Sequence, residues 1–495
     1  MMEPNLVNVL LHRHLESHGL PSDQLTWKID HSPLGGRGMF ATRDIDRGEL
    51  IFVDAPLVVG PRCYNKYLPM CINCYKSGCP LFPCDRGCGL PVCSTLCENS
   101  TGHVAMECDY LRKLRPSCGT MWSMELLQAV VPIRALSLSD DQRNLVGAFE
   151  AHPRAVRELD LLKKNIDEEI NRDDEVFMER VSRVFDTNAF ETAAVVDNSV
   201  SISLRGLYPV GALQNHCCVP NTRHHFDKDQ FLFTRAAFPI KKGDELTMTY
   251  TDLVWDTALR RQYLRMSKHF DCSCRRCSDP LEFGTLLGAL RCANIDCFKN
   301  MFPNDPLNPD TAWTCEDCGV RVSSRQIKGI RSGLSSIVNE ILYKSPRQIL
   351  SFVKGELAIL VPETSSVMMD MKFRVISYFG RAEGLSWENL SNAELRTKAK
   401  YCRDLVSLLD NLGCGDCQKK GLILYEWYCT NVEIERRKSE KGDGNQAAQL
   451  SEAPETKIRE ENYYDDDRII LRKAAEILRH DIAAPDDLSL IEIEP

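Results

Sequence analysis

The sequence has no long apolar run and no excess of positive charge. No stretch of about 18 apolar residues occurs in the 495 residues, so no transmembrane helix or membrane contact is expected. The opening Met-Met-Glu-Pro-Asn-Leu lacks the basic and apolar regions of a secretory signal. The formal net charge of −9 argues against a protein whose main role is binding a polyanion. These absences predict residence in the cytoplasm, the nucleus or both.

Cysteine, in contrast, is abundant, with 23 in the chain. In a reducing compartment metal binding explains clustered cysteines better than disulfides do. Cysteine and histidine gather within residues 71–108, 272–277 and 292–318, at short spacings that favour tetrahedral zinc. A segment as short as 71–108 cannot build a core unaided, so zinc would supply much of its folding free energy. The length of the chain suggests about two to four domains.

Two short stretches carry most of the functional signal. One is Asn-His-Cys-Cys-Val-Pro-Asn at 215–221, and the other is Lys-Gly-Asp-Glu-Leu at 242–246, which continues to Tyr250. A strand that ends in a polar turn would explain either stretch alone. In this order they resemble the N-H-S-C-x-P-N and G-E-E-L-x-x-x-Y motifs of SET-domain lysine methyltransferases, with Cys217 replacing Ser. Residues 32–41, which would otherwise indicate a hairpin turn, are similar to the S-x-x-x-G-R-G-x-F-A opening of those domains.

The resemblance implies transfer of a methyl group from S-adenosylmethionine to a lysine of a protein substrate, histone or non-histone. Such a displacement depends on positioning, on exclusion of water and on a neutral target amine, which an apolar channel favours. Tyr250 is the implied catalytic residue. Asn188 alone would indicate a helix surface or cap, but the segment around it is similar to a cofactor-binding segment of the family. The implied cofactor-binding residues are Gly36, Arg37, Gly38, Asn188, Asn215, His216, Tyr250 and Phe270.

The cysteine spacing within 71–108 resembles a MYND finger, which implies two interleaved zinc sites. One would contain Cys71, Cys74, Cys93 and Cys97. The other would contain Cys84, Cys88, His103 and Cys108, with its last pair one residue longer than the usual H-x3-C. In the family a post-SET zinc is completed by the motif cysteine, here Cys218 with Cys272, Cys274 and Cys277. A fourth, zinc-ribbon-like site is preferred over free thiols for Cys292, Cys297, Cys315 and Cys318.

The resemblance covers the whole chain and implies an α+β multidomain protein of the SET–MYND (SMYD) type, similar to arthropod members. The β-rich SET fold would comprise an N-terminal part (1–70), a helical insert (109–200) and a catalytic part (201–255). The MYND finger (71–108) interrupts it. A post-SET zinc site with a zinc-ribbon-like segment (256–322) and a helical, tetratricopeptide-like C-terminal domain (323–495) follow. Helical spacing predicts helices at 122–131, 155–164, 257–266 and 457–479 and a helical hairpin at 393–437. The polar, Gly- and Ser-containing composition of 438–455 predicts a disordered loop.

One position departs from the family and keeps an alternative open. Related enzymes place a second channel tyrosine four residues before the first post-SET cysteine, where this sequence has Lys268. A catalytically weak or inactive SET–MYND adaptor or transcriptional corepressor is therefore the alternative to an active chromatin-modifying enzyme. A zinc-finger nucleic-acid binder is disfavoured because residues 71–108 contain few Lys or Arg. The resemblance further implies a monomer whose MYND finger takes a proline-rich peptide.

Overall fold

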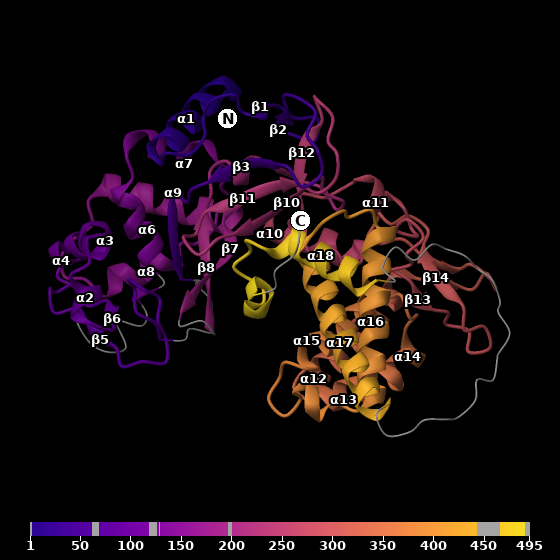
Figure 1. Ribbon diagram of the computed structural model, residues 1–495. Helices are drawn as coiled ribbons and strands as arrows, with labels where there is room; N and C mark the ends of the chain where they lie inside the picture. Colours follow the sequence, from indigo (N-terminus) through magenta and orange to yellow (C-terminus); the bar gives the residue numbers. More distant parts are fainter. Residues whose placement is uncertain are drawn as a thin grey trace. The chain divides into compact units, whose positions relative to one another are not determined.

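The computed structural model describes residues 2–61, 69–117, 126–127, 129–196, 200–442 and 466–490 (Figure 1). The chain divides into two compact units. Unit 1 comprises Met1–Asn215, Thr222–Thr247 and His480–Asp486, and unit 2 comprises His216–Asn221, Met248–Arg479 and Asp487–Pro495. No helix in the described ranges is long and apolar enough to cross a membrane.

Unit 1 contains small antiparallel sheets instead of one large sheet. One has β1 (Trp27–His31), β2 (Arg37–Ala41) and β12 (Glu245–Met248) in this order, and β9 (Asn215–His216) at its edge. A second has the order β10 (Thr222–Phe226), β11 (Leu232–Ala236) and β3 (Leu50–Asp54). A third has the order β4 (Val58–Pro61), β8 (Val200–Leu207) and β7 (Phe190–Val196). The predicted β-rich character of this region is confirmed.

The helices of unit 1 lie before and between these strands. They are α1 (Pro4–Ser17), α6 (Val130–Arg134), α7 (Asp140–Ala148), α8 (Arg157–Lys164) and α9 (Arg172–Asn188), with short 3-10 turns at Ala135–Ser137 and Gly211–Leu213. The cysteine-rich segment adds β5 (Phe82–Pro83), β6 (Pro91–Val92), α2 (Thr95–Glu98), α3 (Thr101–His103), the π-helix η1 (Val104–Cys108) and α4 (Asp109–Lys113). Helix α8 confirms the prediction for 155–164, whereas half of the residues in the 122–131 prediction lie outside the described residues.

Unit 2 begins with helices and a small sheet. Helix α10 (Thr257–Ser267) matches the prediction, and α11 (Arg275–Ser278) follows it. The sheet has the order β13 (Leu290–Arg291), β14 (Asn300–Pro303), β15 (Trp313–Cys315) and β16 (Arg321–Val322). It buries Leu290, Met301 and Trp313 against Ile327 of the next helix. A core built from four short strands and one helix residue is small. A ribbon with so small a core is expected to be held together by a metal.

The rest of unit 2 is helical. It contains α12 (Ser324–Ile341), α13 (Pro346–Lys354), α14 (Glu356–Leu360), α15 (Ser366–Tyr378), α16 (Asn392–Asn411), α17 (Gln418–Gly442) and α18 (Asp467–Leu478), with 3-10 turns at Trp387–Asn389 and Asp486–Leu490. Helices α16 and α17 form the predicted helical hairpin, and α18 packs on α17 (Figure 1). The disordered loop predicted at 438–455 is wrong for residues 438–442, which continue α17, and its remainder lies outside the described residues. Residues 457–465 of the helix predicted at 457–479 also lie outside them.

Serine capping boxes fix where three of these helices begin. Ser323, Ser345 and Ser391 each accept a hydrogen bond from the backbone N–H three residues later. The Gln or Glu at that later position returns a side-chain contact to the serine N–H, so the orphan groups of the first turn are satisfied reciprocally. The local sequence therefore specifies the starts of α12, α13 and α16.

A buried carboxylate fixes the turn that leads into β9. Asp54 at the end of β3 is fully buried, and its Oδ2 accepts the N–H groups of Val210 at 2.7 Å and Gly211 at 2.9 Å. His14 of α1 lies with Nε2 3.3 Å from the other carboxylate oxygen. Since these N–H groups are buried, no water can replace the carboxylate. Asp54 thus sets the path of the chain just before Asn215.

Replacing Asp54 with alanine should destabilise unit 1. The change leaves two buried N–H groups without an acceptor, which costs about 1–3 kcal/mol each. We expect the free energy of unfolding in urea to fall by about 2–4 kcal/mol. Asp30→Ala, which removes an exposed carboxylate paired with Lys28, is the matched control and should change it by less than about 0.5 kcal/mol. Equal effects of the two changes would contradict the assigned role.

Candidate active site and metal centres

In unit 1, three of the predicted cofactor-binding residues, Arg37, Gly38 and Asn215, lie around Glu245. This carboxylate accepts the hydroxyl of Ser32 at 2.8 Å and the Nδ2 of Asn215 at 2.7 Å. Asn215 Nδ2 also donates to the backbone carbonyl of Arg37 at 2.9 Å. The pairing of β12 with β2 places Glu245 opposite Phe40, beside the glycine-containing loop. Ser32 and Glu245 were not predicted as site residues, although Glu245 lies within the motif at 242–246.

The glycines of this loop are needed for two different reasons. Gly36 has a φ of 63°, in the left-handed region that favours glycine. Gly38 lies so close to the Glu245 carboxylate that a Cβ at this position would collide with it. The backbone of residues 36–38 is thereby held against the Asn215–Glu245 pair.

Arg37 contacts Asn215 through its backbone carbonyl and not through its guanidinium. The side chain is buried and donates to the carbonyl oxygens of Met2 and Ala148. Burial lowers the pKa of Arg37 from its usual value. Its guanidinium therefore links the residues before α1 to the end of α7.

Asn188 is the last residue of α9, and its amide is used locally. Its Nδ2 donates to the carbonyl oxygens of Glu150 at 2.9 Å and Val184 at 2.8 Å. These contacts are those of a residue that ends a helix and holds a neighbouring segment. They leave its cofactor role as a prediction.

In unit 2, His216, Tyr250 and Phe270 form an aromatic cluster. The ring centroid of His216 lies 5.2 Å from that of Tyr250 and 6.0 Å from that of Phe270. The rings of Tyr250 and Phe270 are 6.4 Å apart and meet edge to face. Phe270 is 37% exposed, so one side of its ring is available for stacking. The structure thus brings together the three aromatic residues that the sequence predicted.

His216 links this cluster to a cysteine. Its Nδ1 accepts the backbone N–H of Tyr250 at 3.0 Å, and its Nε2 lies 3.2 Å from the Sγ of Cys218. Because a backbone N–H can only donate, Nδ1 is the acceptor and Nε2 carries the proton toward the sulfur. Burial lowers the pKa of His216 to about 4, so the imidazole is neutral at pH 7.

Lys268, the departure from the family pattern, faces Tyr250. Its Nζ lies 5.4 Å from the centroid of the Tyr250 ring, within the range of a cation–π contact. Lys268 ends α10, and the next residue, His269, has a φ of 61°, which turns the chain toward Phe270. The Lys268 ammonium therefore lies beside the predicted catalytic tyrosine.

Cys218, Cys272, Cys274 and Cys277 come together in unit 2, with their sulfur atoms within 4.8 Å of one another. Two fully buried arginines surround this cluster. The Nε of Arg260 lies 3.2 Å from the Sγ of Cys218, and Arg276 donates to the carbonyl of Cys218. Both arginines pair with the buried carboxylate of Glu282, at 2.7 Å and 3.0 Å. Sequence reasoning missed these three charged residues.

The two clusters of the MYND-like segment also form as predicted. They are Cys71, Cys74, Cys93 and Cys97, and Cys84, Cys88, His103 and Cys108. The extra residue between His103 and Cys108 is absorbed by the π-helix η1, whose wider turn returns both side chains to one cluster. The lengthened spacing is thus a local change of helix type and does not remove His103 from the set.

A carboxylate and an arginine stand behind His103. Its Nδ1 lies 2.9 Å from Glu107, whose other oxygen accepts Arg134 Nε at 2.9 Å. Burial alone would raise the pKa of Glu107, but Arg134 and His103 hold it below its usual range. A carboxylate in this place fixes the ring orientation and makes the free imidazole nitrogen a better metal ligand.

The fourth predicted set, Cys292, Cys297, Cys315 and Cys318, meets at one end of the β13–β16 sheet. Each of the four clusters offers four thiol or imidazole ligands, the donor set that tetrahedral Zn²⁺ takes. Among the described cysteines, six belong to none of the four clusters, namely Cys79, Cys217, Cys402, Cys414, Cys417 and Cys429. The clusters fit zinc in donor type and number.

A strand-rich domain with an Asn-His-Cys-Cys turn, a facing tyrosine and a cysteine-closed tail defines the SET class. The SET domain family model matches residues 36–251. The SET domain-containing protein SmydA-8, isoform A, of Drosophila melanogaster is 34% identical over 419 residues, covering 82% of this chain and 89% of that protein. The chain belongs to the SET-domain lysine methyltransferase family, in its SMYD branch.

More distant relatives share the same class. Histone-lysine N-methyltransferase SMYD3 of Homo sapiens is 28% identical over 262 residues, covering 49% of this chain and 59% of that protein. The solved SET domain of LSMT bound to lysine and AdoHcy covers 89% of this chain and 97% of that chain. It is 14% identical with a TM-score of 0.27, a likeness too low to support a statement about this chain.

Replacing Glu107 with glutamine should weaken zinc binding at one centre. The carboxylate that orients His103 is lost, and such changes lower metal affinity by about 10–100-fold. In a chelator competition monitored by a zinc dye, one equivalent of zinc should leave at lower chelator concentration than in the unchanged protein. Asp109→Asn, an exposed carboxylate nearby, is the control and should leave the release curve unchanged. Identical curves for both variants would refute the role of Glu107.

Proposed function

We propose that this chain is an S-adenosylmethionine-dependent protein-lysine N-methyltransferase. The observation that carries the proposal is the His216–Tyr250–Phe270 cluster, built directly on the cysteine cluster that contains Cys218. In unit 1, Asn215 binds the backbone of the glycine loop. Family membership supports the reaction type, and these residues give it a specific place in the chain.

The proposed roles follow from what each group can offer. When bound, S-adenosylmethionine supplies the methyl group on a positively charged sulfur. The backbone of Gly36–Gly38, the amide of Asn215 and the end of α9 at Asn188 would hold its polar ends. The half-exposed ring of Phe270 would stack on the adenine, and the Tyr250 phenol would orient the methyl group and the neutral target amine.

Zinc at the Cys218 centre would position the catalytic tyrosine. Zn²⁺ bound by Cys218, Cys272, Cys274 and Cys277 fixes the sulfur that accepts the His216 N–H. His216 in turn accepts the N–H of Tyr250, so metal, imidazole and tyrosine backbone form one chain of contacts. The other three clusters would hold zinc for folding, two in the MYND finger and one in the ribbon.

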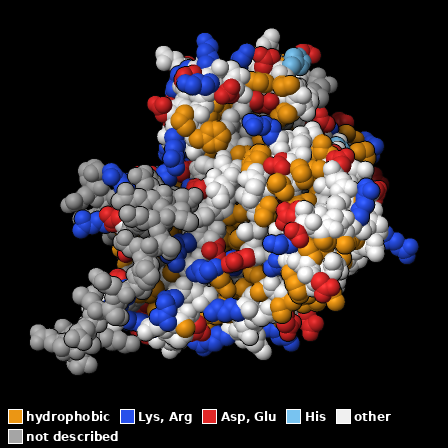
Figure 2. Space-filling view, turned by 90° about the vertical axis from the view of Figure 1, so that its right-hand side faces the viewer, with side chains coloured by type: hydrophobic (Ala, Val, Ile, Leu, Met, Phe, Trp, Pro, Cys, Tyr) orange, Lys and Arg blue, Asp and Glu red, His pale blue; other side chains and the backbone are white. Residues whose placement is uncertain are grey.

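One observation favours the adaptor as a second candidate. The ammonium of Lys268 lies over the Tyr250 ring, where it would repel a second ammonium that approaches the phenol. An adaptor would act through its surfaces, with the MYND finger taking a proline-rich peptide. Direct nucleic-acid binding is disfavoured, since Figure 2 shows acidic and basic side chains interspersed on the face it views.

Calorimetric titration of the zinc-replete chain with S-adenosylmethionine tests the proposal. We expect micromolar binding, weakened at least about tenfold in Asn215→Ala because the contacts to Arg37 and Glu245 are lost. Asn339→Ala, an exposed asparagine of α12, is the matched control and should bind as the unchanged protein does.

Turnover separates the two candidates. Release of S-adenosylhomocysteine in the presence of core histones and a lysine-peptide array should fall by about 100-fold in Tyr250→Phe while cofactor binding is kept. Binding without turnover in the unchanged protein, together with a gain of turnover in Lys268→Tyr, would favour the adaptor. Absence of cofactor binding in a folded, zinc-loaded protein would rule out the enzyme.

A further inference from the structure

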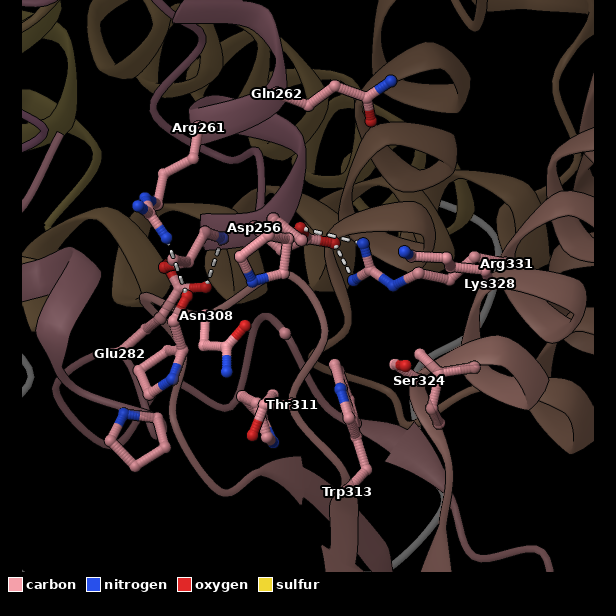
Figure 3. Close-up of a pocket in the computed structure, with 18 of the residues that line it drawn as sticks. Asp256, Arg261, Gln262, Glu282, Asn308, Thr311, Trp313, Ser324, Lys328 and Arg331 are labelled. Carbon is pink, nitrogen blue, oxygen red and sulfur yellow. Dashed lines mark hydrogen bonds and ion pairs between the residues drawn. The ribbon is translucent and has the colours of Figure 1, made fainter. Parts of the chain in front are cut away.

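A cavity in unit 2 is lined by none of the predicted site residues. It has a volume of about 550 Å³ and is bounded by α10, the 279–288 loop, the 303–313 loop and the first half of α12 (Figure 3). We call it the α10–α12 pocket. Its volume falls within the range of about 300–1,000 Å³ that is typical of small-ligand sites. None of its lining residues belongs to a cysteine cluster or to the aromatic cluster.

Much of the wall of the α10–α12 pocket is apolar and rigid. Trp313 and Ile327 form one side, and both side chains are otherwise buried in the ribbon core. Prolines line the rest of the wall, namely Pro280, Pro303, Pro306 and Pro309. Proline and tryptophan lose little conformational freedom when a ligand packs on them, so they favour an apolar body.

The carboxylates at the pocket are already neutralised. Glu282 pairs with Arg260 and Arg276, two arginines that do not line the pocket. Asp256 caps α10 by accepting the Leu259 N–H and also pairs with Arg331, whose side chain reaches it from α12 (Figure 3). Asp279, the third, accepts two backbone N–H groups of its own loop. These acids therefore offer little attraction to a cationic ligand.

Hydrogen-bond donors, in contrast, are in excess. The Nε atoms of Arg261 and Arg331 are buried behind the wall and have no acceptor among the described residues. Lys328 and Arg265 also line the pocket. Lys328 pairs with the exposed carboxylate of Asp310, and a single surface pair of this kind contributes little, whereas Arg265 forms a bidentate pair with Asp271. Ser324 places the positive end of the 18-residue helix α12 at the rim. The pocket thus offers basic side chains and the start of a helix beside an apolar wall.

We propose that the α10–α12 pocket binds a carboxylate carried on an apolar body. The apolar part would pack on Trp313, Ile327 and the prolines, and the carboxylate would meet Arg265, Lys328 and the start of α12. A free arylalkyl carboxylic acid and an acidic residue beside a large apolar residue in a peptide share this chemistry. None of the residues proposed to bind the cofactor or the target lysine lines this pocket, although Glu282, which does line it, also pairs with Arg260 and Arg276 beside Cys218.

Calorimetry on the full zinc-loaded chain tests this proposal with two matched pairs of probes. The small probes are 4-phenylbutyrate and its neutral amide, and the peptide probes are acetyl-Phe-Glu-Leu-amide and acetyl-Phe-Gln-Leu-amide. We expect at least one acid to bind about tenfold more tightly than its neutral partner. Which acid binds distinguishes a small-molecule site from a peptide site. The double change Arg265→Gln with Lys328→Gln should abolish the preference for the acid.

Blocking the pocket provides a second test that does not touch the charged groups. Ala258→Trp places an indole at an exposed lining position of α10 and should lower acid binding at least about tenfold. Leu259→Trp, at the next exposed residue, which does not line the pocket, is the control. Equal binding of acids and neutral partners, equal binding by the two tryptophan variants, or no binding of any probe at about 1 mM would each overturn the proposal.

Discussion

The contact on which unit 2 depends is the one between a buried arginine and two cysteine sulfurs. Arg260 is completely buried, with its Nε 3.2 Å from Cys218 and another nitrogen 3.7 Å from Cys277. Burial alone would lower the pKa of Arg260, but Glu282 and the thiolates raise it above its usual value. Zinc bound by four thiolates carries net negative charge, and in a low-dielectric interior that charge needs fixed positive partners. The same sulfur of Cys218 also accepts the His216 N–H. The contacts that balance the charge of the metal centre are therefore linked to the contacts that position Tyr250.

The MYND-like centre with His103 uses the same physical solution. Glu107 lies between the ligand and the buried Arg134, much as Glu282 lies between Arg260 and Arg276. In both centres a carboxylate and arginine satisfy each other and also orient a metal ligand, so neither charge is left unpaired in the interior. The ribbon centre differs, because Cys318 is exposed and water can screen its charge. The His103 and Cys218 clusters, the two most buried of the four, thus each have an outer layer of paired charges.

Sequence alone predicted the ligand sets because the ligands are chemically distinctive and mostly close in the chain. Cys218, which lies 54 residues before Cys272, came from the motif resemblance and not from spacing. The structure added what has no local signature: Arg260, Glu282 and Asp54 are ordinary charged residues until distant segments bury them. The π-helix at His103 was equally unpredictable, since one extra residue in a helix leaves no compositional trace. Glu245 lay within a recognised motif, yet its partner Ser32 is 213 residues away.

Native mass spectrometry of the purified chain with S-adenosylmethionine tests the central claim, that the Cys218 metal centre holds the catalytic residues in place. We expect a complex with four zinc ions, one for each cysteine cluster, and one cofactor molecule. For Cys272→Ser we expect three zinc ions and loss of the cofactor, since the sulfur that anchors His216 is no longer fixed. A three-zinc protein that keeps S-adenosylmethionine with unchanged affinity would contradict it.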